Sequence, residues 1–489
     1  MNRTQRKLFT LFFILLFSLV APTVVLLAQG YRFNLENNIF IHSGSITIKS
    51  WPRDIDVSVN GEKQTSKTLN IINGAYTING LKPGKYTLTC SKSGYTSWEK
   101  EIEVHSGVST EFWNVLLFPE KEIQEINSTN IPGEAQQIFL SPDNNNELVL
   151  FTEEDSKRKI YIVNQEEDSN ELVFETADYW FVDKKEGLNI EWNSNNKSFI
   201  LPVVDENNEE DYLLVLKGEE TEEVISLNSF LKKDSIHKAR WLFNEKNKLV
   251  LLTEEGNLYF FDYKKETLKL IDEKVSGFDF ADYNIYYSKL PNNTIWSVKQ
   301  SNIEDKTQVT TEILSLEEEE NFVDIIAYDE YRIFVNASDK SLIHNENNKK
   351  DLISTLQPSE KISGVQFSDD GKKLLCWNDH EVWYYMLRDW EIQPKRYFGD
   401  KITITRSSEI IKNVQWMDNY ENIVLSTGST IRVFEVDPRN KTNISDITAL
   451  ENPIEDKDLL YNKNNQTAYF LDGNSIFSVT LIDTGFLGF

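Results

Sequence analysis

The chain has 489 residues and a formal net charge of −27, because 78 acidic residues outnumber 51 lysine and arginine residues. This length predicts two or more domains, each large enough to bury a core. The acidic balance argues against nucleic acid as a partner, since affinity for a phosphate backbone comes largely from cationic side chains. It argues equally against a surface that lies on anionic lipid.

The first thirty residues predict a membrane-spanning helix. Residues 1–7 carry Arg3, Arg6 and Lys7, and residues 8–30 carry no charge. The apolar core, LFTLFFILLFSLVAPTVVLLA, has 21 residues, which is enough to cross about 30 Å of hydrocarbon as a helix. Basic residues before the span predict a short cytoplasmic tail, residues 1–7, and place the bulk of the chain outside the cell membrane.

A cleaved signal peptide is the alternative to an uncleaved transmembrane anchor. Signal peptides have an apolar region of about 7–15 residues, followed by a small-x-small cleavage motif. Ala28 is small enough to precede a cut, but Leu26, two residues earlier, is too large. We therefore expect an uncleaved signal anchor over residues 8–30 and a linker over residues 31–43, while the sequence alone leaves cleavage open.

Residues 44–118 have the pattern of a small β-sandwich. Ile46 and Ile48 alternate with polar residues, as half-buried strands do. Asn60-Gly61 is a strong signal for a two-residue hairpin, and Pro83-Gly84 marks a further turn. A new pattern begins at residue 119, so we expect this stretch to fold as a domain of its own.

The same stretch resembles the PEGA domain, a small surface-associated β-module of bacteria and archaea. The turn Pro83-Gly84 followed by Tyr86, and the later Gly94-Tyr95 pair, are the more specific part of the resemblance. The tetrapeptide that gives the family its name is not intact, because Pro52-Arg53-Asp54-Ile55 stands in its place. The resemblance implies a cell-envelope interaction module without known catalysis. The other residues that carry it are Val57, Val59, Asn60, Gly61 and Leu81.

Residues 119–489 repeat one pattern eight times: a strand with an aromatic residue, a polar turn and an apolar strand, as in SGVQFSDDGKKLLCWN. The period is about 46 residues, and most units continue with a third and a fourth strand, as a β-propeller blade requires. The turns resemble those of TolB-like and WD-repeat propellers. We expect an all-β protein whose propeller has eight blades, or alternatively seven, with the repeat aromatics packed between blades. These repeat aromatics are Phe139, Trp192, Trp241, Phe280, Tyr328, Phe367, Trp416 and Tyr461.

Two strand assignments concern the ends of repeat units. In the fourth unit, the apolar residues of 310–316 (TTEILSL) predict the fourth strand. The last unit shows only three strands, while residues 122–127 (EIQEIN) belong to no complete unit. Open sheet edges would expose unpaired backbone groups. We therefore predict that residues 122–127 form the outer strand of the last blade beside residues 475–482, with Ile123 and Ile126 as apolar contacts.

Motifs that carry chemistry are scarce. The histidines stand apart, and none has metal-ligand spacing or belongs to an H-E-x-x-H motif. Asp379-His380-Glu381 is the one polar cluster with a histidine, and we expect it in an exposed turn. Cys90 and Cys376 are expected to be buried, unpaired small hydrophobes. The sequence thus predicts no catalytic residue, no cofactor and no metal, and it leaves the ligand-binding residues unknown.

Two classes of function are compatible with this organisation. The first is a non-catalytic scaffold, tethered to the cell membrane, that binds a protein, peptide or glycan of the bacterial cell envelope. The second is an extracytoplasmic enzyme whose propeller carries a hydrolase or lyase site, because carboxylates paired in space leave no trace in a sequence. We favour the scaffold, since it accounts for the helix, the small domain and the propeller together. The partner and the oligomeric state are not readable from the sequence.

Overall fold

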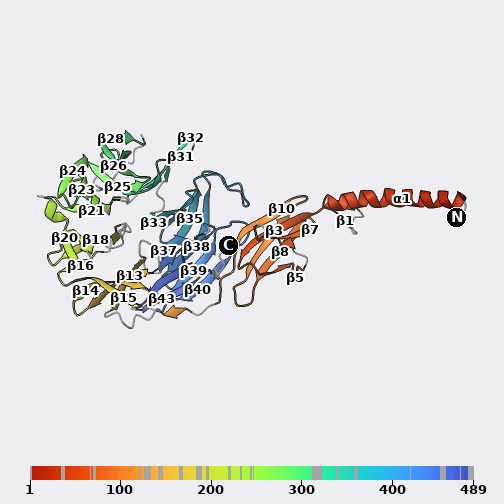
Figure 1. Cartoon of the computed structure of the whole chain (residues 1–489), viewed down its shortest axis with the longest axis horizontal. Helices are drawn as coiled ribbons and strands as arrows, with labels where there is room; N and C mark the ends of the chain where they lie inside the picture. Colours follow the sequence, from red (N-terminus) through yellow and green to blue (C-terminus); the bar gives the residue numbers. More distant parts are fainter. Residues whose placement is uncertain are drawn as a thin grey trace.

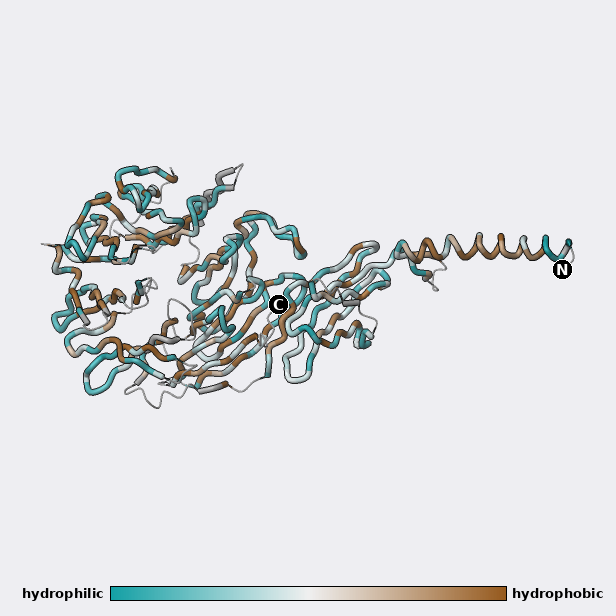
Figure 2. The backbone as a smooth tube through the Cα atoms, in the orientation of Figure 1, coloured by the Kyte–Doolittle hydropathy of each residue, from teal (hydrophilic) through white to brown (hydrophobic). Residues whose placement is uncertain are grey.

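The computed structural model describes residues 3–482 except for 35–38, 66–67, 70–72, 121–122, 126–133, 141–146, 165–168, 183–189, 194–197, 218–221, 232–233, 243–244, 246, 311–321, 338–340, 348–349, 357–361, 419, 452–458 and 474. These described residues form one α-helix, one short 3₁₀ helix and 43 β-strands. The all-β character predicted from the alternating sequence is confirmed. Figure 2 shows the apolar helix apart from strands that alternate between hydrophobic and hydrophilic residues.

Helix α1 (Arg3–Ala28) contains most of the predicted membrane span, residues 8–30, but begins earlier, within the predicted tail, and ends two residues sooner. An 18-residue window within Gln5–Ala28 has a mean hydropathy of 2.7 and is not buried by the rest of the chain, so by length and composition the helix is able to cross a membrane. It projects away from the β-domains in Figure 1. The region predicted as a linker contains a hairpin of β1 (Tyr31–Asn34) and β2 (Ile39–His42).

A sandwich of two four-stranded sheets follows the hairpin, with the orders β10-β3-β7-β6 and β5-β4-β8-β9. All pairs are antiparallel except β10 with β3, which run parallel. Ile46, Val57, Leu88 and Cys90 are fully buried between the sheets. The strands are β3 (Gly44–Trp51), β4 (Asp56–Val59), β5 (Glu62–Lys63), β6 (Thr68–Leu69), β7 (Tyr76–Leu81), β8 (Gly84–Ser91), β9 (Trp98–Val104) and β10 (Ser109–Leu116).

Residues 134–480 form eight consecutive sheets that follow one another round a ring in Figure 1. Within a sheet, antiparallel hairpins carry the chain outward from the first strand. The first strands of neighbouring sheets contact one another; for example, β25 contacts β29, and β37 contacts β41. This is the arrangement of a β-propeller.

Numbered in chain order, sheet 1 holds β12 (Glu134–Leu140), β13 (Glu147–Glu154), β14 (Lys157–Asn164) and β15 (Ser169–Thr176). Sheet 2 holds β16 (Tyr179–Phe181), β17 (Glu191–Trp192), β18 (Ser198–Asp205), β19 (Glu210–Lys217) and β20 (Glu222–Ser226), and the 3₁₀ helix η1 (Asn228–Phe230) follows it. Sheet 3 holds β21 (Ile236–Trp241), β22 (Lys248–Thr253), β23 (Leu258–Asp262) and β24 (Thr267–Asp272). Sheet 4 holds β25 (Val275–Ala281), β26 (Asn284–Lys289), β27 (Thr294–Lys299) and β28 (Asn302–Gln308).

Sheet 5 holds β29 (Asp324–Asp329), β30 (Arg332–Asn336), β31 (Ser341–Asn347) and β32 (Lys350–Leu356). Sheet 6 holds β33 (Gly364–Phe367), β34 (Lys373–Trp377), β35 (Glu381–Met386) and β36 (Lys401–Arg406). Sheet 7 holds β37 (Ile411–Trp416), β38 (Asn422–Thr427), β39 (Thr430–Glu435) and β40 (Ile444–Ala449). Sheet 8 holds β41 (Leu459–Asn462), β42 (Thr467–Asp472), β43 (Ser475–Thr480) and β11 (Gln124–Glu125).

The ring closes between sheets 8 and 1. Tyr469 and Ile476 share an apolar core with Ile138 and Tyr161 of sheet 1. On the outer side of sheet 8, Gln124 and Glu125 of β11 pair with Ser478 and Phe477 of β43. The predicted closing strand is therefore confirmed for these residues. Its apolar residue Ile123 packs against the core between sheets 7 and 8, whereas Ile126 lies outside the described residues.

The repeat aromatics pack where they were expected, between neighbouring sheets. Trp241, Trp416 and Tyr461 are buried in cores shared by two sheets. Phe139, Trp192, Phe280 and Phe367 are partly buried against such cores, and the half-buried Tyr328 ring lies 5.6 Å from the Phe367 ring of the next sheet.

The fourth strand predicted at residues 310–316 is wrong. The fourth strand of sheet 4 is β28, residues Asn302–Gln308, and residues 311–316 lie outside the described part. β28 is the outer edge of its sheet, and all but one of its side chains are exposed, so it carries no alternating apolar pattern. The fourth strand was predicted at residues 310–316 instead because these residues include apolar side chains.

Candidate functional site

The residues that the sequence singled out for chemistry lie apart from one another. His380 is exposed in a bend, where its backbone N–H donates to Asn378 Oδ1 at 2.9 Å, as expected. Cys90 and Cys376 are buried and form no disulfide, and burial raises the pKa of the Cys376 thiol, so it stays protonated. Within the described residues, no group of three or more His, Cys, Asp or Glu side chains is placed to hold a metal ion.

The most elaborate polar arrangement joins the sandwich to the propeller. Lys100 lies on edge strand β9 and faces inward, in phase with Trp98 and Ile102. Its Nζ lies 3.2 Å from Glu435 Oε2 and 3.5 Å from Asp437 Oδ1, and it donates to the Asp437 carbonyl oxygen at 3.1 Å. The Lys100 side chain is fully buried, and the two carboxylates that pair with it belong to the propeller.

The two carboxylates of this junction respond differently to burial. Burial raises the pKa of Glu435, although attraction to Lys100 opposes the shift. Burial also opposes ionisation of Asp437, but hydrogen bonding and attraction by Arg439 outweigh it and hold the pKa of Asp437 below its usual range. Arg439 contacts Asp437 at 2.6 Å and places its guanidinium 4.1 Å from the Phe112 ring of the sandwich. Lys100 of the sandwich therefore forms one cluster with the carboxylates and the guanidinium of the propeller.

Side-chain amides of the propeller cover the two sandwich edges, β9 and β10. Gln393 accepts from the Glu111 N–H at 3.0 Å and donates to the Ser109 carbonyl oxygen at 2.9 Å. Asn443 accepts from the Glu99 N–H at 3.1 Å, and Asn440 donates to the Glu101 carbonyl oxygen at 2.9 Å. Exposed strand edges invite pairing with other chains, and these amides satisfy backbone groups that would otherwise be open.

A second buried cluster holds the loop that carries Gln393. Glu421 receives both Arg396 Nη atoms at 2.7 Å and also contacts the Lys373 ammonium. Burial opposes ionisation of Glu421, but Lys373 and Arg396 outweigh it and keep its pKa below the usual range. Arg396 belongs to the connection between β35 and β36, so this cluster fixes the connection against sheet 7 and presents Gln393 to the sandwich.

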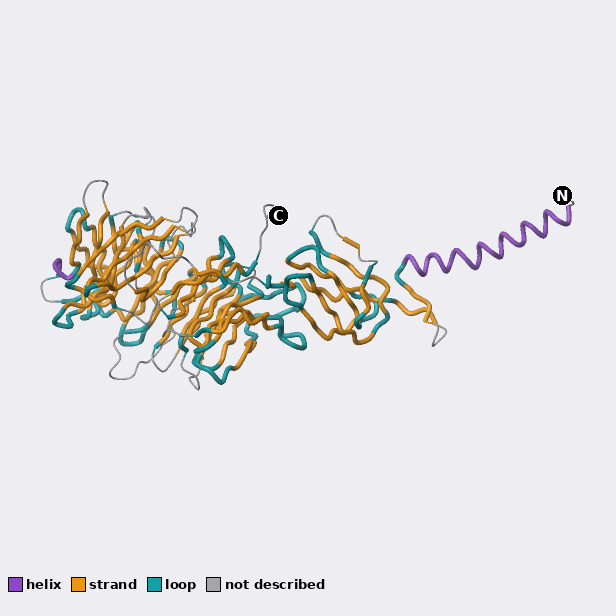
Figure 3. The backbone as a smooth tube through the Cα atoms, turned by 90° about the horizontal axis from the view of Figure 1, so that it is seen from below, coloured by secondary structure: helices purple, strands orange, loops and turns teal. Residues whose placement is uncertain are grey.

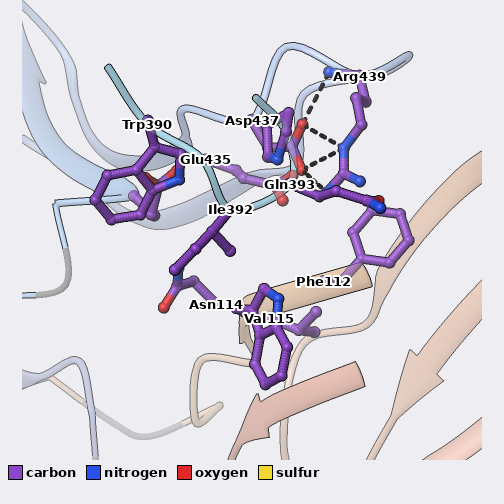
Figure 4. Close-up of a pocket in the computed structure, with 12 residues that line it drawn as sticks. Phe112, Asn114, Val115, Trp390, Ile392, Gln393, Glu435, Asp437 and Arg439 are labelled. Carbon is purple, nitrogen blue, oxygen red and sulfur yellow. Dashed lines mark hydrogen bonds and ion pairs between the residues drawn. The ribbon is translucent and has the colours of Figure 1, made fainter. Parts of the chain in front are cut away.

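The junction leaves little free space. Figure 4 shows its cavity between Phe112 and Val115 of β10 and Trp390, Ile392 and Gln393 of the propeller. The cavity has a volume of about 20 Å³, which is room for about one water molecule. The junction is therefore a packed interface between domains and not a ligand pocket.

The innermost strands of the propeller carry polar residues immediately before several repeat aromatics. Glu191, before Trp192, accepts from the Trp241 N–H at 3.1 Å and from Arg240 Nε at 3.2 Å. Arg240 also pairs with Asp279 of the next sheet. Burial raises the pKa of Glu191, although attraction to Arg240 opposes the shift.

The same pattern recurs in sheets 6 to 8. Gln366 Oε1 accepts from the Trp416 N–H at 2.9 Å, and Gln415 Oε1 accepts from the Tyr461 N–H at 2.9 Å. These side chains join the inner strand of sheet 6 to that of sheet 7, and the inner strand of sheet 7 to that of sheet 8. The sequence signal for these contacts is a polar residue directly before the repeat aromatic, as at Glu191, Gln366 and Gln415.

A groove of about 700 Å³ lies over sheets 3 and 4. Tyr283, in the turn between β25 and β26, is 58% exposed at this groove. Lys299 is exposed beside it, and the buried Nε2 of Gln300 has no hydrogen-bond partner within the described part of the chain. The groove is lined by Glu245, Lys248, Phe260, Lys269, Asp282, Tyr283, Asn284, Lys299, Gln300, Ser301, Asn302 and Ile303. Its lining thus combines cationic, acidic, amide and aromatic side chains.

A known family matches the sandwich. Residues 43–116 match the PEGA domain. The match begins one residue before β3 and ends with β10, so it spans the sandwich strands and confirms the resemblance read from the turns. The altered Pro52-Arg53-Asp54-Ile55 segment lies within the PEGA domain, between β3 and β4. No curated protein sequence matches the chain.

Solved structures resemble the propeller at low similarity. The β-propeller domain of Cps50 (Swd1) from Myceliophteria thermophila has 9% identity and a TM-score of 0.42, and the likeness covers 73% of this chain and 99% of that one. Hsv2 from Kluyveromyces lactis has 11% identity and a TM-score of 0.38, with 65% and 99% covered. The propeller assignment itself stands on the sheet order and the cores between sheets.

Proposed function

We propose that this protein is a membrane-anchored scaffold that holds its propeller in a fixed position outside the cell membrane, where the propeller binds a protein, peptide or glycan of the cell envelope. The observation that carries the proposal is the junction around Lys100. A buried cluster of ions between the PEGA domain and the propeller removes the freedom that a flexible linker would allow.

Direct hydrogen bonds also connect the PEGA domain to the end of the helix. The Ser43 N–H donates to the Gly30 carbonyl oxygen at 2.9 Å, and the Gly107 N–H donates to the Ser43 carbonyl oxygen at 3.2 Å. Helix end, hairpin and PEGA domain are thereby bonded to one another. Figure 3 shows the PEGA domain between the helix and the propeller. A scaffold that sets the position of a binding surface needs this continuity.

The groove over sheets 3 and 4 is our candidate for the binding surface. We propose to use residues 31–489 as bait for cell-envelope extracts, with crosslinking and mass spectrometry as the readout. Tyr283→Ala in the groove is compared with Tyr331→Ala, which changes a tyrosine at the matching turn of sheet 5 that is 45% exposed. We expect a partner that the unchanged bait and Tyr331→Ala capture and that Tyr283→Ala loses.

Capture that is equal in both variants would show that the groove is not the binding surface. Failure of every bait to enrich a partner would contradict the scaffold. Turnover of a glycan or peptide by the same material would replace the scaffold with the hydrolase or lyase alternative.

A further inference from the structure

The hairpin between the helix and the PEGA domain exposes apolar side chains. Phe33, Ile39 and Phe40 are 45%, 52% and 38% exposed, respectively. Phe33 and Phe40 are directly opposite in the strand register, and their rings lie 5.2 Å apart. A two-stranded hairpin with one apolar aromatic pair is at best marginally stable when it stands alone in water. The exposed side chains therefore call for a further contact.

Contacts at its base fix the hairpin to the end of α1. His42 Nε2 lies 2.9 Å from the Gln29 carbonyl oxygen, and the His42 ring stacks on Tyr31 with 4.7 Å between centroids. Gly107 of the PEGA domain lies against the other side of His42, where a Cβ would come within 2.5 Å of Nδ1. Since both strands begin or end at these contacts, the position of the hairpin follows from that of the helix.

The hairpin lies on the helix side of the PEGA domain. In Figures 1 and 3 it extends from the end of α1 toward the helix side of the molecule, away from the propeller. A helix that crosses the membrane would therefore bring the hairpin to the outer membrane surface. Aromatic side chains are enriched at this level, where an apolar ring contacts lipid while neighbouring polar groups remain hydrated.

We propose that the β1–β2 hairpin is a lipid-contacting element that inserts Phe33, Ile39 and Phe40 into the headgroup region beside α1. This inference rests on the proposed membrane anchoring. Unpaired backbone groups along the outer edges of two strands are costly in hydrocarbon, which limits insertion to the headgroup level. The contact is apolar, so it needs no anionic lipid and is compatible with the acidic chain.

Nitroxide spin labels test the depth of the hairpin in the full chain. Each nanodisc of phosphatidylcholine holds one copy of the chain. The two native cysteines are buried, so an introduced cysteine is labelled selectively. Labels are placed at Ile39→Cys and Phe40→Cys. Leu16→Cys in α1 is the reference for hydrocarbon, and Val224→Cys, 45% exposed on outer strand β20, is the reference for water.

The readout is the ratio of collision rates with oxygen, which enters lipid, and with a water-soluble nickel chelate. We expect the ratio at positions 39 and 40 to be several-fold higher than at 224 and lower than at 16. A ratio equal to that at 224, with a high ratio at 16, would overturn the hairpin proposal and leave the anchoring intact. A low ratio at 16 would instead overturn the anchoring. Low collision rates with both reagents at 39 and 40 would indicate a protein contact and would also overturn the lipid contact.

Discussion

Substituting Lys100 by methionine tests how firmly the PEGA domain is held to the propeller. Methionine keeps most of the packing of the lysine stem but removes the charge that lies 3.2 Å from Glu435 and 3.5 Å from Asp437. These carboxylate side chains are only 8% exposed, so bulk water compensates poorly for the loss of the ammonium. Lys63→Met is the matched control, because Lys63 pairs with Asp56 at 2.8 Å while both side chains are more than half exposed.

Removing one partner from a buried ion pair costs about 3–5 kcal/mol, because the other charge stays buried without compensation. At ~1.4 kcal/mol per factor of ten, separation of the two domains becomes roughly 100- to 4,000-fold more frequent. An exposed pair such as that of Lys63 contributes about 0–1 kcal/mol. The two substitutions should therefore differ by more than an order of magnitude in their effect on the junction.

Hydrogen exchange measured by mass spectrometry detects this difference at β9. Its amides are protected partly by Asn443 and its neighbours in the propeller, so exchange at Trp98–Val104 should accelerate strongly in Lys100→Met. In Lys63→Met, exchange of the same peptide should remain as in the unchanged protein. Equal exchange in the two variants would refute the claim that buried charge holds the domains together.

Two further predictions concern the propeller. Glu421→Gln should destabilise the propeller by about 3–5 kcal/mol near neutral pH. Because the pKa of Glu421 in the folded protein is lowered from 4.5, the stabilisation by its charge is present above pH 4.5 and is lost as the pH falls through that lowered pKa. The difference in unfolding free energy between Glu421→Gln and the unchanged protein should therefore narrow in acid, and a difference that stays constant with pH would contradict this role. Ile123→Asp should lower the melting temperature by several degrees, because it puts a charge against the core between sheets 7 and 8. Val224→Asp, on an exposed outer strand, should leave the melting temperature nearly unchanged. Equal shifts of the two variants in calorimetry would show that the segment around β11 does not stabilise the ring.

The fold was predictable because its signals are local. Apolar alternation marks half-buried strands, and turn residues such as Asn60-Gly61 mark hairpins, so both the sandwich and the repeated units are visible in the sequence. The closing strand β11 was predictable from the missing fourth strand of the last unit. β28 was missed because an exposed outer strand needs no apolar side chains and therefore shows no period.

The junction was not predictable in the same way. Lys100 lies in phase with the buried residues Trp98, Ile102 and Val104, and a charge at such a position was a visible sign of a buried partner. Its partners, Glu435 and Asp437, lie on a strand of sheet 7 and just after it, and no spacing in the sequence connects them to Lys100. Pairing over such a separation is set by how whole domains dock.

Closing the ring with strands from both ends of the propeller sequence delays its completion during synthesis. Gln124 and Glu125 emerge long before their partners in β43, and at ~5–20 residues per second the roughly 350 residues between them take on the order of 20–70 s to appear. Until then Ile138 and Tyr161 of the first blade lack the neighbours that cover them. A cell that makes this protein has to keep a partly built ring from pairing with other chains, and the final blade is the point at which that exposure ends.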